Sequence, residues 1–365
     1  MTSIRFCAVL FSLAVWGWVA SCGPKGGSSG DVTPDPPPTT SGSTPYVWTT
    51  PANFPEPNYD FAANPLTKEG VALGRTLFYD ATLSKDGTIN CAFCHSPATA
   101  FSHTDHPVSH GIRNQVGFRN VPGIFNMAWR TNFFWDGSIP DLNGLPVAPI
   151  QNPIEMGDSL ANVLVKVRTS GRYRPLFKAA YGTDSITSER FLKSLAQFML
   201  TMVSANSGYD KFVRKEANAA LPDAAQRGLV LFQAKCASCH KEPFFTDKSF
   251  RNNGLGKSTM VSVDDQGRGA ITGQTADKYK FRVPSLRNVE FTPPYMHDGR
   301  FSTLQQVLRH YATGVQDSPQ LDPLLKQNGQ LGIPMTQQEQ NDIITFLFTL
   351  TDYSFISNPD LQPLR

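Results

Sequence analysis

The sequence predicts a mostly α-helical protein with long loops and little strand, in which one module is used twice. The pattern CxxCH occurs at residues 91–95, as CAFCH, and again at 236–240, as CASCH. A helical pattern with the same small signature precedes each copy, GRTLF at 74–78 and GLVLF at 228–232. The chain has 365 residues, enough for about two domains of ordinary size. We therefore expect one helical module for each CxxCH motif.

The first 22 residues are typical of an export signal. Arg5 is the only charge before the apolar run FCAVLFSLAVWGWVA, which is too short for an ordinary membrane-spanning helix. The run ends in VASC, and its small residues before Cys22 resemble the lipobox of bacterial lipoproteins, in which the cysteine is acylated after cleavage. An ordinary cleaved signal with a chance cysteine is the alternative.

The next stretch, residues 23–60, begins with a Gly-, Pro- and Thr-rich sequence that has almost nothing to bury, so we predict a disordered tether. Together with the signal, it predicts a protein of the bacterial cell envelope, on the periplasmic or cell-surface side, which touches the membrane only through a lipid on Cys22. Lys and Arg number 33 against 30 for Asp and Glu, so the charge gives no reason to expect nucleic-acid binding.

Four of the six cysteines lie in the two CxxCH motifs. Such a motif is open to three interpretations: a dithiol or disulfide, half of a metal–thiolate site, or a covalent c-type haem with the histidine on its iron. A zinc site built from both CxxC pairs leaves each adjacent histidine unexplained. We therefore predict two c-type haems, one on Cys91, Cys94 and proximal His95, the other on Cys236, Cys239 and proximal His240.

Helix signals support the second module. Pro222 marks a helix start, and apolar residues precede the second CxxCH motif at Leu229, Leu231 and Phe232. Thr336 and Glu339 form a capping-box pattern before a C-terminal helix that we expect to pack on the second core through Ile343, Ile344, Phe346, Leu347 and Leu350.

A further helix is predicted to begin with Ser302 as its cap. Leu304, Val307, Leu308 and Tyr311 follow at i, i+3, i+4 and i+7, which places them on one face. Tyr311 should therefore point inward, with His310 turned away from it.

Two long stretches carry a family resemblance: FRNVPGIFNMAWRTNFFWDGSIPDLNGLPVAPIQNPIEMG at 118–157 and FRVPSLRNVEFTPPYMHDGRFSTLQQVLRHY at 281–311. The chain resembles the bacterial dihaem cytochrome c peroxidase superfamily, which includes MauG, from about Phe61 to Asp352. The resemblance implies two cytochrome c-like haem domains, which we place at 61–205 and 206–365, with the N-terminal haem as the peroxide site.

The resemblance also implies roles for single residues. Trp135 of the WDG segment would lie between the haems, and Glu155 of the NPxEM segment would move the proton that peroxide cleavage requires. A calcium ion is implied at the side chain of Asn120 and the carbonyls of Thr292 and Pro294. From the residues alone, Trp135 is equally a core aromatic and Glu155 a surface carboxylate in a turn.

The ligand of the second haem separates the branches of the family. Classical members have Met fourteen residues after the histidine of the PYxH segment, whereas the MauG branch has Tyr, and that position from His297 is Tyr311. A tyrosine oxygen is a hard donor to iron, as in catalase. The simpler interpretation of Tyr311 is a core tyrosine with its hydroxyl on a backbone group.

On the first haem, the distal position of members that need reductive activation aligns with Ile112, which predicts an open iron. A loop shift that brings His110 to the iron is the alternative; His103 and His106 lie nearer the CxxCH motif. Leu145 replaces a glutamine that many relatives carry, so we expect a drier pocket.

We therefore predict a dihaem oxidoreductase that uses hydrogen peroxide at the N-terminal haem and draws electrons through the second haem from a protein partner. The resemblance to MauG implies that the electrons come from a residue of that partner, which is oxidised. The alternative is a cytochrome c peroxidase that detoxifies peroxide with electrons from a small cytochrome or cupredoxin. Two further alternatives are not enzymes: a dihaem electron carrier, and a binding module stapled by zinc.

Overall fold

The computed structural model describes residues 42–258 and 260–364, which belong to one compact unit. The predicted signal, the lipidation site Cys22 and the tether up to residue 41 lie outside the described residues. None of the helices within the described ranges has the length and apolar character needed to cross a membrane.

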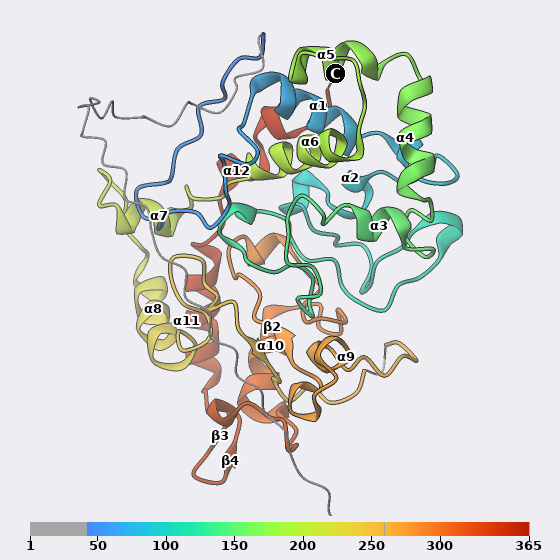
Figure 1. Cartoon of the computed structure of the whole chain (residues 1–365). Coiled ribbons are helices and arrows are strands. Elements are labelled where there is room, and N and C mark those ends of the chain that lie inside the picture. Colours follow the sequence, from blue (N-terminus) through green and yellow to red (C-terminus); the bar gives the residue numbers. More distant parts are fainter. Residues whose placement is uncertain (1–41, 259, 365) are drawn as a thin grey trace, which may run out of the picture. The chain divides into compact units, whose positions relative to one another are not determined.

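Helices connected by long loops dominate the described chain, as predicted (Figure 1). Strand is limited to two short antiparallel pairs, β1 (Phe250–Arg251) with β2 (Phe281–Arg282) and β3 (Lys326–Gln327) with β4 (Gln330–Leu331). The α-helices are α1 (Lys68–Phe78), α2 (Cys91–Cys94), α3 (Val147–Gln151), α4 (Leu160–Thr169), α5 (Tyr173–Tyr181), α6 (Ser188–Leu200), α7 (Gly208–Val213), α8 (Asp223–Lys235), α9 (Arg268–Thr272), α10 (Leu304–Arg309), α11 (Gln337–Phe348) and α12 (Tyr353–Ile356).

Buried apolar side chains form two clusters. The larger, the first core, is built around α1, α4, α5 and α6 and the loops between residues 100 and 156. The second core lies around α8, α10 and α11. Figure 1 shows α1, α5 and α6 gathered near the top and α8 beside α11 at lower left.

The same crossing of two helices recurs in each core. In the first, α1 packs on α6, and in the second, α8 packs on α11. The glycine of each small signature stands at the contact: a methyl group on Gly74 would overlap the carbonyl of Ser194, and one on Gly228 the carbonyl of Asp342. The repeated sequence signature therefore marks a position where two helix backbones approach too closely for any side chain.

Substitution of Gly228 by alanine should lower the free energy of unfolding by about 1–3 kcal/mol, because α8 must move away from α11. The measurement is chemical unfolding of the haem-loaded protein followed by circular dichroism. Gly208→Ala is the matched control, because a methyl group there would meet only the carbonyl of Thr349, at 3.6 Å. Equal stability of the two variants would contradict the close approach.

The predicted capping box of the C-terminal helix is confirmed. The Thr336 side chain accepts from the backbone N–H of Glu339, and the Glu339 carboxylate accepts from the backbone N–H of Thr336. The predicted apolar positions of α11 are buried in the second core. Pro222 is the cap residue of α8, again as predicted.

Two sequence predictions need correction. The cap of α10 is Thr303 and not Ser302. The side chain of Thr303 accepts from the backbone N–H of Gln306, three residues later, which is the spacing that a helix cap requires.

The tether predicted to extend to residue 60 ends earlier. Trp48 donates from Nε1 to the carbonyl of Leu200 at 3.0 Å, and Phe54 is buried against Trp129. These aromatic side chains supply the apolar area that the Gly- and Pro-rich stretch lacks.

The first core also receives the last part of the chain. Phe355 and Leu361 are buried in it. Arg75 of α1 donates from Nε to the carbonyl of Gln362 at 2.6 Å. The boundaries 61–205 and 206–365 remain predictions, and the segment after α11 is in contact with α1.

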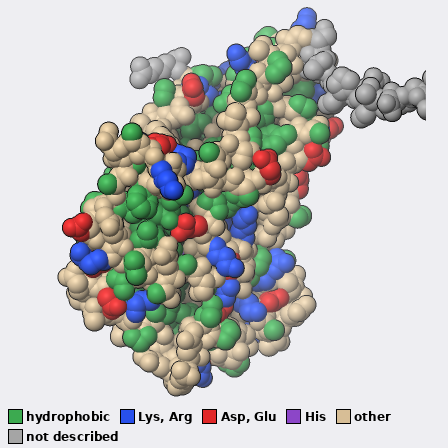
Figure 2. All heavy atoms as spheres, turned by 90° about the vertical axis from the view of Figure 1, so that its left-hand side faces the viewer, with side chains coloured by type: hydrophobic (Ala, Val, Ile, Leu, Met, Phe, Trp, Pro, Cys, Tyr) green, Lys and Arg blue, Asp and Glu red, His purple; other side chains and the backbone are tan. Residues whose placement is uncertain are grey.

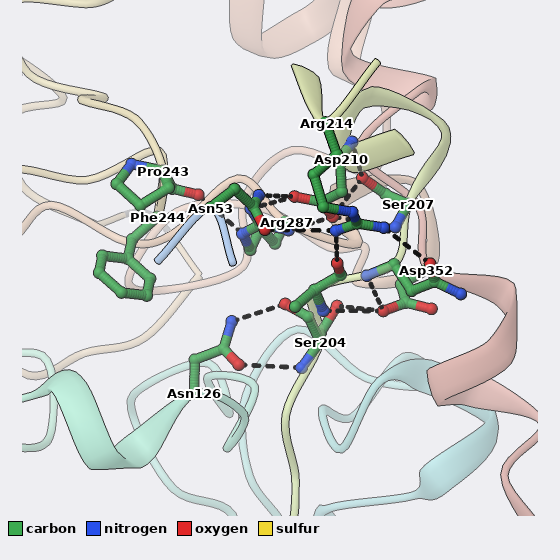
Figure 3. A network of polar contacts seen from close by, with 12 residues as sticks. Asn53, Asn126, Ser204, Ser207, Asp210, Arg214, Pro243, Phe244, Arg287 and Asp352 are labelled. Carbon is green, nitrogen blue, oxygen red and sulfur yellow. Dashed lines mark hydrogen bonds and ion pairs between the residues drawn. The ribbon is translucent and has the colours of Figure 1, made fainter. Parts of the chain in front are cut away.

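A buried polar network joins the segment between α6 and α7 to both cores (Figure 3). Arg287 makes a bidentate ion pair with Asp210, 2.8 Å at each oxygen, and the two side chains are 1% and 0% exposed. Asn53 donates to Asp210 at 2.7 Å. Burial alone would raise the pKa of Asp210, but Arg287 outweighs it and the pKa is lowered.

The same network includes Asp352, which accepts from the backbone N–H groups of Ala205 and Asn206 at 2.9 and 2.8 Å (Figure 3). Asn126 exchanges two hydrogen bonds of 2.9 Å with the backbone of Ser204. Segments far apart in the sequence are thus fixed to one another by bonds that are shielded from water.

The face that carries α7 and α8 shows positive and negative side chains mixed with hydrophobic ones (Figure 2). Phe212 and Val213 of α7 and Val230 of α8 are exposed. No field of a single sign dominates this face.

Candidate active site

The first CxxCH motif forms one helical turn, α2. Asn90 caps it, accepting from the backbone N–H of Phe93 at 2.8 Å. His95 follows at the end of the turn, and its Nδ1 lies 2.8 Å from the carbonyl of Phe101. Phe101 is fully buried and has a φ of 57°, a left-handed conformation that aims its carbonyl at the ring.

The second CxxCH motif repeats this arrangement. Nδ1 of His240 lies 3.0 Å from the carbonyl of Phe245, which is also buried and has a φ of 53°. Burial lowers the pKa of both histidines, that of His95 to about 4. Each ring is therefore neutral near pH 7. The proton on Nδ1 is held by a carbonyl, which leaves the lone pair of Nε2 for an iron.

All four cysteines of the two motifs are free. Burial raises the pKa of Cys91, Cys94 and Cys236 to about 12, so these sulfurs are thiols where no group is attached. Among the described residues, the one cluster of three or more metal-ligating side chains contains no cysteine. The alternative of a zinc ion held by both CxxC pairs is therefore wrong, because the pairs do not converge.

A cavity of about 590 Å³ lies beside the second CxxCH motif. Cys236, Cys239 and His240 line it, and Trp135 and Tyr311 also contribute to its wall. Much of the remaining lining is apolar, including Phe232, Phe281, Val283, Leu286, Leu304, Leu308, Ile343 and Leu347. An apolar pocket with two thiols and a neutral imidazole is suited to a covalently attached haem.

Two arginines, Arg282 buried and Arg130 partly buried, provide an independent test of that fit. Arg130 and Arg282 line the cavity and donate only to backbone carbonyls, those of Gly123, Phe125 and Phe134. Burial lowers the pKa of Arg282 to about 10 and that of Arg130 well below its usual range, with no carboxylate of the described chain opposing the shift. Buried cations without a partner are costly. The carboxylates of a haem's propionates would neutralise them.

Tyr311 lines the cavity, whereas His310, which is buried, is not among the described residues that line it. Burial raises the pKa of Tyr311 to about 12, against the opposing effect of Asn253. The tyrosine follows α10 within a π-helical turn, His310–Gly314, a widened turn frequent at functional sites. His310 has its Nε2 3.0 Å from the carbonyl of Asn253. The position of Tyr311 agrees with the predicted inward side, while His310 is buried as well, at a place away from the cavity.

Glu155 lies next to the first CxxCH motif. The charge of Glu155 contributes to the raised pKa of Cys94. Asn152 donates from Nδ2 to Oε1 of Glu155 at 3.0 Å, which fixes the carboxylate. Burial raises the pKa of Glu155, and the hydrogen bond from Asn152 opposes that rise. A partly buried, positioned carboxyl group with a raised pKa is suited to proton transfer near neutral pH.

The loop after the first motif packs against Glu155. Ile112 is buried and its backbone N–H donates to the carbonyl of Glu155 at 2.8 Å. The Sγ of Cys94 donates to the carbonyl of His110 at 3.5 Å, while the ring of His110 lies 4.2 Å from that of His106. The loop thus places Ile112 beside Glu155 and the imidazole of His110 beside another histidine. Leu145 is buried in the first core.

Trp135 connects this loop with the cavity beside the second CxxCH motif. The indole Nε1 donates to the carbonyl of Asn120 at 2.8 Å, and the side chain of Asn120 donates to the carbonyl of Pro107 at 3.0 Å. The backbone carbonyl of Trp135 accepts from Arg282 at 2.7 Å. The indole therefore lines the cavity beside the second CxxCH motif, and its N–H is hydrogen-bonded to the loop that follows the first motif.

Comparison with known proteins decides the family. Residues 68–218 match the family model described as di-haem cytochrome c peroxidase. MauG of Methylorubrum extorquens is 37% identical over 311 residues, 82% of each chain. The cytochrome c551 peroxidase of Nitrosomonas europaea is 34% identical over 305 residues, 83% of this chain and 86% of that protein. The chain belongs to the dihaem cytochrome c peroxidase and MauG family.

Solved structures agree with this assignment. A MauG-like protein associated with microbial copper homeostasis superposes with a TM-score of 0.77 at 32% identity, over 87% of this chain and 99% of that one. The diheme peroxidase BthA of Burkholderia thailandensis shares the fold, with a TM-score of 0.69 at 23% identity, over 83% and 91% of the two chains. The protein is thus a dihaem oxidoreductase with two c-type haems, which uses hydrogen peroxide together with a protein electron donor or substrate.

Several functional residues could not be found from the sequence. Asn152 opens the NPxEM segment that contains Glu155, but the segment alone does not show that its amide donates to the Glu155 carboxylate. Arg130 gave one usable signal, because it is the only charged residue between Arg119 and Asp136, whereas Arg282 stands close to Lys278, Lys280 and Arg287. The residues implied for calcium all line the cavity beside the second CxxCH motif: Asn120, Thr292 and Pro294. Calcium at this place remains a prediction.

The raised pKa of Glu155 predicts how the family reaction depends on pH here. A carboxylate that accepts a proton from peroxide must be ionised, so the reaction rate should fall as pH falls through the pKa of Glu155. Because burial raises this pKa, the midpoint should lie above the ordinary value of 4.5. Stopped-flow rates across pH measure it, and Glu155→Gln should remove the inflection. A midpoint below 4.5 would assign the proton transfer to another group.

Proposed function

We propose that the protein is a MauG-like member of its family, in which hydrogen peroxide drives the oxidation of a residue on a partner protein. Tyr311 carries the proposal. This side chain, where classical members have Met, lines the cavity beside Cys236, Cys239 and His240. A tyrosine oxygen on iron favours the higher oxidation states, as a thioether does not. A site of this kind stores oxidising equivalents.

When bound, the haems supply the redox chemistry: hydrogen peroxide accepts two electrons and two protons to give two waters, and the electrons come from the partner. The chain's own residues manage the protons and the path. The carboxylate of Glu155 can take a proton from one peroxide oxygen and return it to the other, while Asn152 holds Oε1 in place.

Trp135 supplies the connection between the two sites. Its ring is buried and its Nε1 is fixed on the carbonyl of Asn120, so the indole keeps one orientation. An aromatic ring in the wall between two redox sites gives electrons a shorter route than saturated side chains. Ile112, which cannot bind iron, would leave the distal position of the first site open.

The test mixes the fully ferric, haem-loaded protein with one equivalent of hydrogen peroxide and follows both haems by stopped-flow absorbance and freeze-quenched EPR. Rapid loss of both ferric signals without prior reduction is the expected result. Reaction only after one haem is reduced would place the protein with peroxidases that draw electrons from a small cytochrome or cupredoxin. Absence of reaction would make it an electron carrier.

Tyr311→Met separates these functions further. A thioether favours reduced iron, so this variant should need one-electron reduction before it reacts with peroxide. Tyr279→Phe is the matched control, because that exposed hydroxyl contacts Asp264 and does not line the cavity. If Tyr311→Met reacts as fast as wild type in the ferric state, Tyr311 is a core tyrosine.

We also propose calcium at Asn120, Thr292 and Pro294. The amide Nδ2 of Asn120 is bonded to Pro107, which leaves its oxygen for a hard cation beside the two carbonyls. Calcium at 100 times its dissociation constant should raise the unfolding free energy by about 2.7 kcal/mol. Equal stability in calcium and in chelator would overturn this site.

We further propose a cell-envelope location with a lipid on Cys22. Mass spectrometry of the mature N-terminus tests this location.

A further inference from the structure

Three histidines outside the CxxCH motifs come together on the loop that follows the first motif. They are His103, His106 and His110, and one ring nitrogen from each lies within 4.8 Å of the others. Nε2 of His103 is 3.2 Å from Nδ1 of His106. The rings of His106 and His110 are 4.2 Å apart at their centroids. No other group of three ligating side chains occurs in the described part of the chain.

Hydrogen bonding within the protein leaves this cluster incompletely satisfied. Nδ1 of His103 faces the carbonyl of Phe93 at 3.3 Å, which assigns the proton to Nδ1 and the lone pair to Nε2. Nδ1 of His110 is buried and makes no hydrogen bond of good geometry, although the backbone of Val108 lies near the ring. A buried ring nitrogen without a partner costs free energy, and a bound cation would remove that cost.

The environment supplies neutral ligands and a way in. Burial lowers the pKa of His103 and of His110, and the neighbouring imidazoles lower them further. Neutral imidazole is the form that binds a metal. His103 is buried while His106 is exposed, so one side of the cluster faces solvent. Water can occupy a fourth position from that side.

We propose that His103, His106 and His110 form a binding site for a divalent transition-metal ion, with Cu²⁺ bound most tightly. Imidazole nitrogen suits copper, zinc and nickel, and the general order of affinity places Cu²⁺ first. No carboxylate belongs to the cluster, which disfavours calcium and magnesium.

The position of the site gives it a structural consequence. The carbonyl of His110 lies 3.5 Å from Sγ of Cys94, and the next residues pack on Glu155 through Gly111 and Ile112. A metal ion would therefore fix the loop that packs against Glu155. It would also hold the imidazole of His110 in the cluster and away from an axial position on iron.

The test uses the haem-loaded protein without a polyhistidine tag, stripped with chelator and titrated with CuSO₄ in a calorimeter, with EPR of the bound Cu²⁺. Haem attachment matters because it blocks the four thiols. Wild type should bind one equivalent with hyperfine splitting from three nitrogens. His106→Gln, at an exposed position, should raise the dissociation constant by about 100-fold or more.

Asp105→Asn is the matched control, since it removes a neighbouring charge and keeps all three imidazoles, and it should retain one equivalent. The proposal is overturned if wild type and His106→Gln bind copper equally. It is also overturned if the first haem shows a bis-imidazole low-spin signal that His110→Gln abolishes. Failure to bind copper leaves the proposed reaction with peroxide standing, whereas His110 on the first haem iron would count against both proposals. The EPR spectrum of the ferric haems distinguishes these two outcomes.

Discussion

Replacing Glu155 with glutamine is expected to slow the reaction with hydrogen peroxide by about 10²–10⁴-fold, the contribution of general acid–base catalysis by a positioned side chain. The glutamine keeps the shape of the side chain and the contact with Asn152, but its amide cannot take up a proton. Stopped-flow measurement of the ferric, haem-loaded protein with peroxide gives the rate directly. Haem absorbance spectra should be unchanged, because Glu155 contributes to neither CxxCH motif.

Glu189→Gln is the control for this variant. That carboxylate is largely exposed on α6, where it pairs with Lys193 at 2.7 Å, and its loss should leave the rate unchanged. Asn152→Leu tests positioning, because it removes the hydrogen bond to Oε1 and keeps the carboxylate. Its rate should fall less than that of Glu155→Gln, with the pH midpoint shifted upward. A Glu155→Gln variant as fast as wild type would show that another group moves the proton.

The second large effect concerns stability. Arg287→Met should lower the free energy of unfolding by about 3–5 kcal/mol, because it leaves the carboxylate of Asp210 buried without its partner. Arg287 and Asp210 are 1% and 0% exposed, so water cannot replace the lost charge. The measurement is urea unfolding of the haem-loaded protein at neutral pH.

Arg174→Met provides the control, because Arg174 and Asp184 are 56% and 59% exposed and an exposed ion pair contributes less than about 1 kcal/mol. The lowered pKa of Asp210 also fixes the pH dependence. Stabilisation is present above the ordinary carboxyl pKa and is lost only as pH falls through the lowered value. If Arg287→Met and Arg174→Met were equally stable, the network of Figure 3 would have no special weight.

Local signals in the sequence predicted the elements whose causes are local. A capping box needs only Thr336 and Glu339, and the repeated signature around Gly74 and Gly228 is visible as letters before its close helix contact is known. The inward face of Tyr311 followed from spacing alone. Each of these depends on residues within about two helical turns of each other.

Features that depend on residues far apart could not be predicted in this way. Asn152 and Glu155 are close in sequence, but only the packing of the 110–112 loop buries the pair. Arg130 and Arg282 meet at one cavity from opposite halves of the chain. The spacing of His103, His106 and His110 was visible, yet a loop has no period that would show the three rings converging. The tether was predicted too long because composition averages hide Trp48 and Phe54.

The segment after α11 has a consequence for the order of folding. Phe355 and Leu361 belong to the first core, so that core lacks two of its members until almost the entire polypeptide has been synthesised. The second core draws on residues 209–350 and can close earlier. Although N-terminal units usually fold first during synthesis, here the half made last can be finished before the half made first.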